Sequence, residues 1–204
     1  MSKKNDSNNV VLYLLIAAIG ISLVGTFMLY NETSITGYAT TGTANLTIVT
    51  RTEINFTVDN INFGTGYVHS SCVSCEMDSE GNEEATCCVD FHGETDGFTI
   101  ENIGNTNVSL NVSFAKDANT LLGGNAATNS YQLKASNGAF PGCTGNLGTI
   151  AYTEIATTSS YLVCDNMNFK VGTNEVDVDI KVVVPEDSKK GHLVDTITAT
   201  ATTV

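Results

Sequence analysis

Apolar residues are distributed in two different ways along this chain of 204 residues. Residues 10–30 form a continuous run of 21 positions without a charged side chain. As an α-helix rising about 1.5 Å per residue, this run would be roughly 32 Å long, enough to cross the apolar core of a bilayer. After residue 43, short stretches instead alternate apolar and polar residues. The pattern therefore predicts one N-terminal transmembrane helix followed by a separate folded domain.

The alternating stretches predict β-strands, because every second side chain of a strand lies on the same face. In residues 175–184, valine and isoleucine occupy one face, whereas acidic residues and Lys181 occupy the other. Strands are expected at residues 44–48, 54–58, 98–103, 108–114, 129–135, 150–155, 161–163, 175–184 and 193–204. Gly64-Thr65-Gly66 interrupts the pattern, and residues 115–122 are the one candidate for a short helix. The sequence thus predicts an all-β fold, an antiparallel β-sandwich of the jelly-roll or immunoglobulin-like type.

Charge places the predicted domain outside the cell. Lys3 and Lys4 precede the apolar run and few basic residues follow it closely, so the positive-inside rule keeps the N-terminus in the cytoplasm. The formal net charge of −13 repels polyanions, and no nucleic-acid partner is expected. The expected order is a disordered cytoplasmic tail (residues 1–9), a transmembrane helix (10–30), a spacer (31–43) and an extracellular domain (44–204).

The apolar run is either a membrane anchor that the mature protein retains or a signal peptide that is cleaved off. The apolar region of a cleaved signal peptide spans about 7–15 residues, and this run is longer, which favours a retained membrane anchor. The best small-x-small cleavage sequence, Gly37-Tyr38-Ala39, lies well past Tyr30. A retained run ties residues 44–50 to the membrane, whereas cleavage would leave them as a free strand.

All six cysteines follow the apolar run, and an even number on the oxidising side of a membrane indicates disulfides. Four of them lie in a predicted cysteine-rich hairpin, residues 69–92, whose two strands flank an acidic loop at residues 78–84. The candidates are Cys72, Cys75, Cys87, Cys88, Cys143 and Cys164.

Six cysteines allow fifteen pairings, and the position of the turn inside this segment favours some of them over others. A two-residue turn at Gly81-Asn82 sets Cys75 opposite Cys88, and Cys87 then pairs most simply with Cys72. A turn shifted by half a residue would set Cys87 opposite Cys75 instead. In either case Cys143 and Cys164 are left to close the loop between them.

A metal site in residues 69–92 is the competing interpretation, since His69 and His92 flank the four cysteines. Cys-x-x-Cys matches half of a zinc ligand set, but the vicinal Cys87-Cys88 pair has side chains that diverge on a strand. The acidic loop lacks the glycine and glutamate positions of a calcium-binding loop. We therefore expect disulfides there, and neither a metal nor a cofactor.

Motifs of catalysis are missing from the sequence, which contains no His-Glu-x-x-His, Gly-x-Ser-x-Gly or glycine-rich phosphate loop. We expect a protein that is not an enzyme. Asn-x-Ser/Thr sequons add glycosylation candidates at Asn31, Asn45, Asn55, Asn107 and Asn111.

Three segments share one resemblance. They are residues 42–48 (GTANLTI), residues 98–110 (FTIENIGNTNVSL) and residues 184–199, which contain VPED and GHLVDTITA. Together with the N-terminal apolar run, they resemble small surface β-sandwich proteins of the camelysin and TasA type and the archaeal bundling pilins similar to these. The resemblance implies a jelly-roll-like sandwich, and self-association in which residues 44–50 complete the sheet of a neighbouring copy. Camelysin has been described as a protease, but no metalloprotease motif occurs here and no activity is implied.

These observations predict a non-enzymatic, membrane-anchored protein of the cell surface that serves in an envelope layer, a filament or adhesion. The alternative is an extracellular binding module that uses residues 72–88 to hold a partner or a divalent cation.

Overall fold

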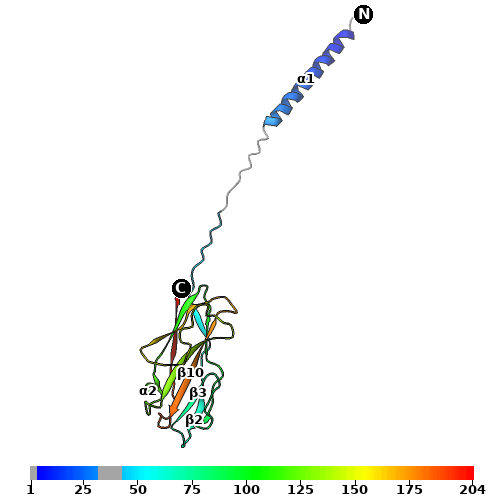
Figure 1. The fold of residues 1–204 in the computed structure, drawn as a ribbon. Helices are drawn as coiled ribbons and strands as arrows, with labels where there is room; N and C mark the ends of the chain where they lie inside the picture. The colour runs from blue at the N-terminus through cyan, green and yellow to red at the C-terminus, as the bar shows by residue number, and fades with distance from the viewer. Residues whose placement is uncertain (1–3, 32–42) are drawn as a thin grey trace. The chain divides into compact units, whose positions relative to one another are not determined.

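The computed structural model describes residues 4–31 and 43–204, and the side chains of the first helix at residues 10–24. The chain divides into two compact units, Met1–Thr47 and Ile48–Val204. The first unit contains the helix α1 (Lys4–Asn31), and the second contains all the β-strands (Figure 1). Most of the predicted spacer, residues 31–43, lies outside the described residues, as does the Gly37-Tyr38-Ala39 sequence.

Helix α1 covers the whole apolar run and begins earlier than predicted. The disorder expected for residues 1–9 is wrong from Lys4 onward, because a helix already nucleated gains one hydrogen bond for each residue that extends it. Within the residues that the structure describes, no helix combines the length and the apolar character needed to cross a membrane.

The second unit consists of antiparallel β-sheets, as the alternating pattern predicts. The larger sheet has the order β1-β5-β10-β7-β8, and β3 also pairs with β10. Its strands are β1 (Ile54–Val58), β3 (Ser74–Asp78), β5 (Phe98–Asn102), β7 (Ser130–Asn137), β8 (Thr153–Glu154) and β10 (Glu175–Pro185). The three-stranded sheet is β11-β6-β9, made of β6 (Val108–Phe114), β9 (Ser160–Met167) and β11 (Ile197–Thr203). A two-stranded sheet pairs β2 (Gly64–Val68) with β4 (Cys88–Phe91), and α2 (Ala118–Leu121) is one short helix turn.

A single apolar core lies between the two larger sheets. The inward side chains of β10 and β6 are buried at every second position, from Val176 to Ile180 on one strand and from Val108 to Val112 on the other. Phe114 of β6 makes an edge-to-face contact with Tyr131 of β7, with ring centroids 5.7 Å apart. Burial of each large aliphatic side chain stabilises the fold by roughly 1.5–3 kcal/mol, so this alternation holds the sheets together.

Two strand predictions are wrong. Residues 44–48 do not form a strand, because an extended segment needs a neighbouring strand for its backbone hydrogen bonds. Gly64-Thr65-Gly66 begins strand β2 rather than ending one. A Cβ on Gly66 would lie 2.6 Å from the backbone nitrogen of Phe91, so glycine here permits the close pairing of β2 with β4.

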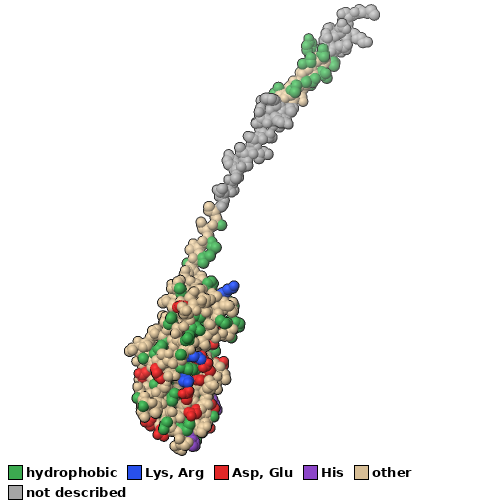
Figure 2. Space-filling view, in the orientation of Figure 1, with side chains coloured by type: hydrophobic (Ala, Val, Ile, Leu, Met, Phe, Trp, Pro, Cys, Tyr) green, Lys and Arg blue, Asp and Glu red, His purple; other side chains and the backbone are tan. Residues whose placement is uncertain are grey.

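Charge is unevenly spread over the second unit. Acidic side chains gather over its lower half in the view of Figure 2, around the strands labelled β2 and β3 in Figure 1. Few basic side chains lie among them on this face. The acidic composition therefore appears on the molecule as an acidic end.

Candidate functional site

The cysteine segment joins two sheets. Strand β3 pairs with β10 and strand β4 pairs with β2, so the expected two-stranded hairpin does not form. One isolated bridge, Met77 to Glu83, is all that remains of it among the described residues. Strand β3 instead takes β10 as its neighbour, with Lys181 opposite Asp78 and Pro185 opposite Ser74.

Disulfides connect the two halves of this segment, Cys72 with Cys87 and Cys75 with Cys88. These are the pairs expected for a turn at Gly81-Asn82 rather than for the shifted turn. The N–H groups of Cys87 and Cys88 both donate to the carbonyl of Glu84, at 2.9 and 2.8 Å. Cys87 and Cys88 therefore lie at the end of a tight turn. In this position Cys87 bonds to Cys72, just before β3, and Cys88 bonds to Cys75, within β3.

The acidic tip of the segment is occupied by hydrogen bonds within the protein. Oδ1 of the buried Asp78 accepts from the backbone N–H groups of Glu80 and Asn82, both at 2.9 Å. The side-chain amide of Asn82 donates to both oxygens of Asp78. Asp78 therefore closes the turn, while Gly81 supplies its positive φ of 84°.

The two histidines near the cysteines are exposed, and His69 forms a hydrogen bond with Ser71 at 2.7 Å. In the described part of the chain, the one group of potential metal ligands close enough to share an ion is Cys143, Cys164 and Asp165. Both of its sulfurs belong to a disulfide and cannot act as thiolates.

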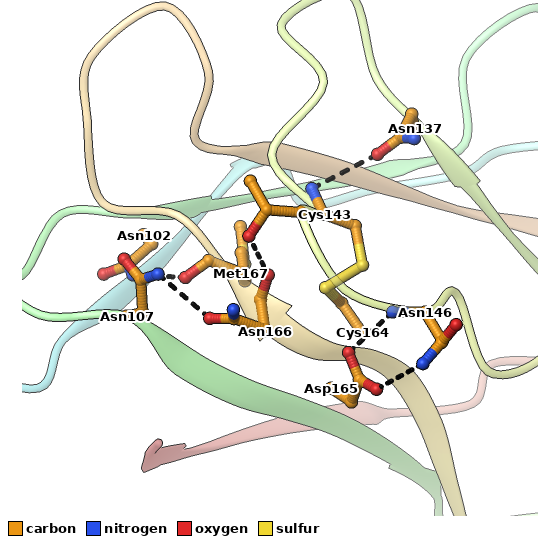
Figure 3. The surroundings of a disulfide bond; sticks show 10 residues. Asn102, Asn107, Asn137, Cys143, Asn146, Cys164, Asp165, Asn166 and Met167 are labelled. Atoms are coloured by element: carbon orange, nitrogen blue, oxygen red, sulfur yellow. Dashed lines mark hydrogen bonds between the residues drawn. A yellow bond between two sulfur atoms is a disulfide. The ribbon is translucent and has the colours of Figure 1, made fainter.

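The disulfide between Cys143 and Cys164 fixes the glycine-rich loop after β7 against the buried part of β9 (Figure 3). Asn137 accepts from the N–H of Cys143 at 3.2 Å. Asn146 donates to Asp165 from its backbone at 2.6 Å and its side chain at 2.9 Å, and these bonds lower the pKa of Asp165. Asparagine side chains thus hold the loop on both sides of the bridge, as Figure 3 shows.

A second polar cluster, which no sequence motif marks, lies on the outer face of the larger sheet. Lys134 of β7 and Asp179 of β10 are direct partners in the strand register, and their Nζ and Oδ2 atoms are 3.7 Å apart. Nζ of Lys134 is also 2.5 Å from Oε1 of Glu80. Tyr152 lies against both Lys134 and Lys181, with ring-to-Nζ distances of 5.0 and 4.9 Å.

Asp179 is buried, although strand alternation predicted it on the solvent face. Ser79 covers it from the turn after β3, and its hydroxyl donates to Oδ1 at 3.3 Å. Ser136 donates to Oδ2 at 3.1 Å. Burial raises the pKa of Asp179, while Lys134 and the serine hydroxyls act more weakly in the opposite direction.

The segment before β1 presents apolar side chains to solvent. Leu46, Ile48 and Val49 are 85%, 79% and 71% exposed. The backbone is held from Val49 onward, where Asn105 donates to the carbonyl of Val49 at 2.9 Å and accepts from the N–H of Arg51 at 2.7 Å. Residues 44–48 form no bridge to a strand of the described chain.

The sequons lie in different surroundings. Asn45 and Asn55 are exposed, whereas Asn107 and Asn111 are half-buried at or within β6. The amide of Asn107 donates to Asn166 at 2.9 Å. The side chain of Asn31 lies outside the described residues.

Comparisons with models of protein families, with curated proteins and with solved structures each gave no significant match to this chain.

Proposed function

We propose that this protein is a non-enzymatic structural or adhesive protein of the cell surface, held at the membrane by its N-terminal apolar run. The observation that carries the proposal is the disulfide set. Three bridges tie the β unit together, and the described residues include no free cysteine. Disulfides persist in oxidising compartments, which favours an exported domain.

The membrane attachment rests on the amino-acid sequence. Residues 10–30 carry no charge, and Lys3 and Lys4 precede them. A hydrophobic run of this length with basic residues on one flank favours insertion with the C-terminal domain outside. The acidic end of the β unit fits an exposed surface that repels other polyanions.

A jelly-roll-like sandwich that assembles by strand addition is part of the same proposal. Strands distant in sequence pair in the larger sheet, such as β5 with β10, as in Greek-key sandwiches. Among the strands that the structure describes, β11 pairs only with β6, and its sequence ITATATT lacks the charges and proline that protect exposed edges. Residues 44–50 of a second copy, with exposed Leu46 and Ile48 on one side, are a suitable added strand.

The alternative binding function of residues 72–88 has weaker support. Asp78 closes its own turn, and Glu80 is engaged by Lys134 and by the hydroxyl of Tyr152 at 3.0 Å. A cation at the tip would have to displace these groups.

Topology and thiol state test the proposal on the full-length protein. In intact cells, an added protease should remove a C-terminal tag and leave an N-terminal tag protected. Alkylation without reduction should add no mass, and alkylation after reduction should modify all six cysteines. A protected C-terminal tag, or six thiols that react without reduction, would overturn it.

N-terminal sequencing of the membrane-bound protein decides between a retained and a cleaved apolar run.

A further inference from the structure

The cluster of Lys134, Asp179 and Glu80 combines an amine, a buried carboxyl group and a second carboxylate in contact with the amine. We propose that Lys134 and Asp179 condense into an intramolecular isopeptide bond, with Glu80 transferring the protons. The bond would covalently cross-link β7 to β10 within the larger sheet. It is independent of where the protein resides in the cell.

The strand register supplies the proximity. Lys134 and Asp179 lie directly opposite each other on paired antiparallel strands, so their side chains share one face of the sheet. Nζ of Lys134 is 3.7 Å from Oδ2 of Asp179, so the amine lies beside the carboxyl group whose Cγ it would attack. The two groups need only a side-chain rotation to meet.

The surroundings favour the uncharged carboxyl group and the exclusion of water. Asp179 is 6% exposed, and a Cβ on Gly97 would lie 2.7 Å from its Oδ1. The ring of Tyr152 covers the amine side of the pair. Hydroxyl donors from Ser79 and Ser136 already contact the two oxygens of Asp179, where negative charge develops when the amine adds.

Glu80 is placed for proton transfer, with Oε1 2.5 Å from the nitrogen of Lys134. It takes a proton from the ammonium, and the nitrogen lone pair then forms a bond to Cγ of the protonated Asp179. One Cγ–O bond breaks, and that oxygen leaves as water after receiving a proton through Glu80. The last proton passes through Glu80 to solvent, so that one ammonium and one protonated carboxyl group become one amide, one water and one released proton.

Lys181 provides a matched comparison. It contacts the same Tyr152 ring, but its Nζ pairs with Glu76 at 2.6 Å, and Glu76 is an exposed residue. The carboxyl group that pairs with Lys181 is therefore open to solvent, and water is not excluded from it. The same chemistry is not expected there.

A peptide map of the full-length protein tests the cross-link directly. After reduction, alkylation and trypsin digestion, residues 117–170 should appear uncleaved at Lys134 and joined to residues 171–181, with the mass of one water missing. Recovery of residues 117–134 and 171–181 as separate, full-mass peptides from folded protein, with its three disulfides intact before reduction, would overturn the proposal.

Substitutions identify which side chains form the isopeptide bond and which assist it. Lys134→Arg keeps the positive charge and should abolish the linked peptide, and Glu80→Gln should slow its formation by about 100-fold. Lys181→Arg should leave it at the wild-type level. Formation of the link at the wild-type rate in Glu80→Gln would overturn the assigned role of Glu80, and loss of the link in Lys181→Arg would overturn the assignment of Lys134 as the one reacting amine. The wild-type map decides the existence of the bond even if a variant fails to fold.

Discussion

Asn102 and Asn174 are buried neighbours that exchange two hydrogen bonds. The N–H of Asn102 donates to the carbonyl of Asn174 at 3.0 Å, and the side-chain amide of Asn174 donates back to the carbonyl of Asn102 at 3.1 Å. The side chain of Asn102 also accepts from Gly104 and donates to the carbonyl of Thr106, both at 3.0 Å. The pair thus joins the turn that leaves β5 to the start of β10.

Replacing Asn102 by alanine should lower the free energy of unfolding by about 2–3 kcal/mol, because buried partners lose their hydrogen bonds. Urea unfolding of the full-length protein measures this change. The control Asn60→Ala, at an exposed position, should stay within about 0.5 kcal/mol of wild type. Equal effects of the two substitutions would contradict the assigned role.

Removing the bridge between Cys143 and Cys164 with a double serine variant should cost about 3 kcal/mol, since the closed loop is longer than 15 residues. The same unfolding measurement checks this. Reduction of the wild type followed by alkylation of all six thiols should cost more than the double variant does. A double variant as stable as wild type would mean that the asparagine contacts alone hold the loop.

The pH dependence of stability should carry a contribution from Asp195. Its carboxylate oxygens are buried without a hydrogen bond of normal geometry in the described part of the chain, and burial raises its pKa. The folded state therefore binds a proton more tightly than the unfolded state, in which the pKa is about 3.9. This contribution is complete below that value and is lost as the pH rises through the folded pKa.

Asp195→Asn should accordingly be more stable than wild type at neutral pH, and the difference should shrink toward about pH 4. Thermal unfolding of both proteins across this range tests the sign. Tyr131→Phe is an informative companion, because its hydroxyl acts against the rise in the pKa of Asp195. A difference that grows as the pH falls would contradict the assignment.

Self-association through residues 44–50 should be sensitive to substitutions on one face of that segment and insensitive to substitutions on the other. Ile48→Lys should abolish assembly without changing the stability of the β unit, because Ile48 is exposed within a single chain. Thr47→Lys adds the same charge to the opposite face and should assemble as wild type does. Light scattering of the purified full-length protein distinguishes these outcomes. A monomeric wild type, or assembly of both variants, would exclude this mode of association.

The amino-acid sequence by itself determined the main strands of the fold. The alternation in β1 and β6 is strong enough that both strands form at the predicted residues, 54–58 and 108–114. A buried face at every second position leaves a strand few other ways to satisfy both its side chains and its backbone. The loop from Asn137 onward and the helix turn α2 also follow from local composition.

Tertiary structure decided what local pattern does not contain. Strand β3 exists because β10 is long enough to pair with it, and residues 44–48 remain outside a sheet because no neighbouring strand meets them in the described chain. Asp179 has the polar pattern of a surface residue, but the turn at Ser79 covers it beside Lys134. Burial and proximity depend on which distant segments meet, and such contacts are set by the packing of the whole unit rather than by nearby residues.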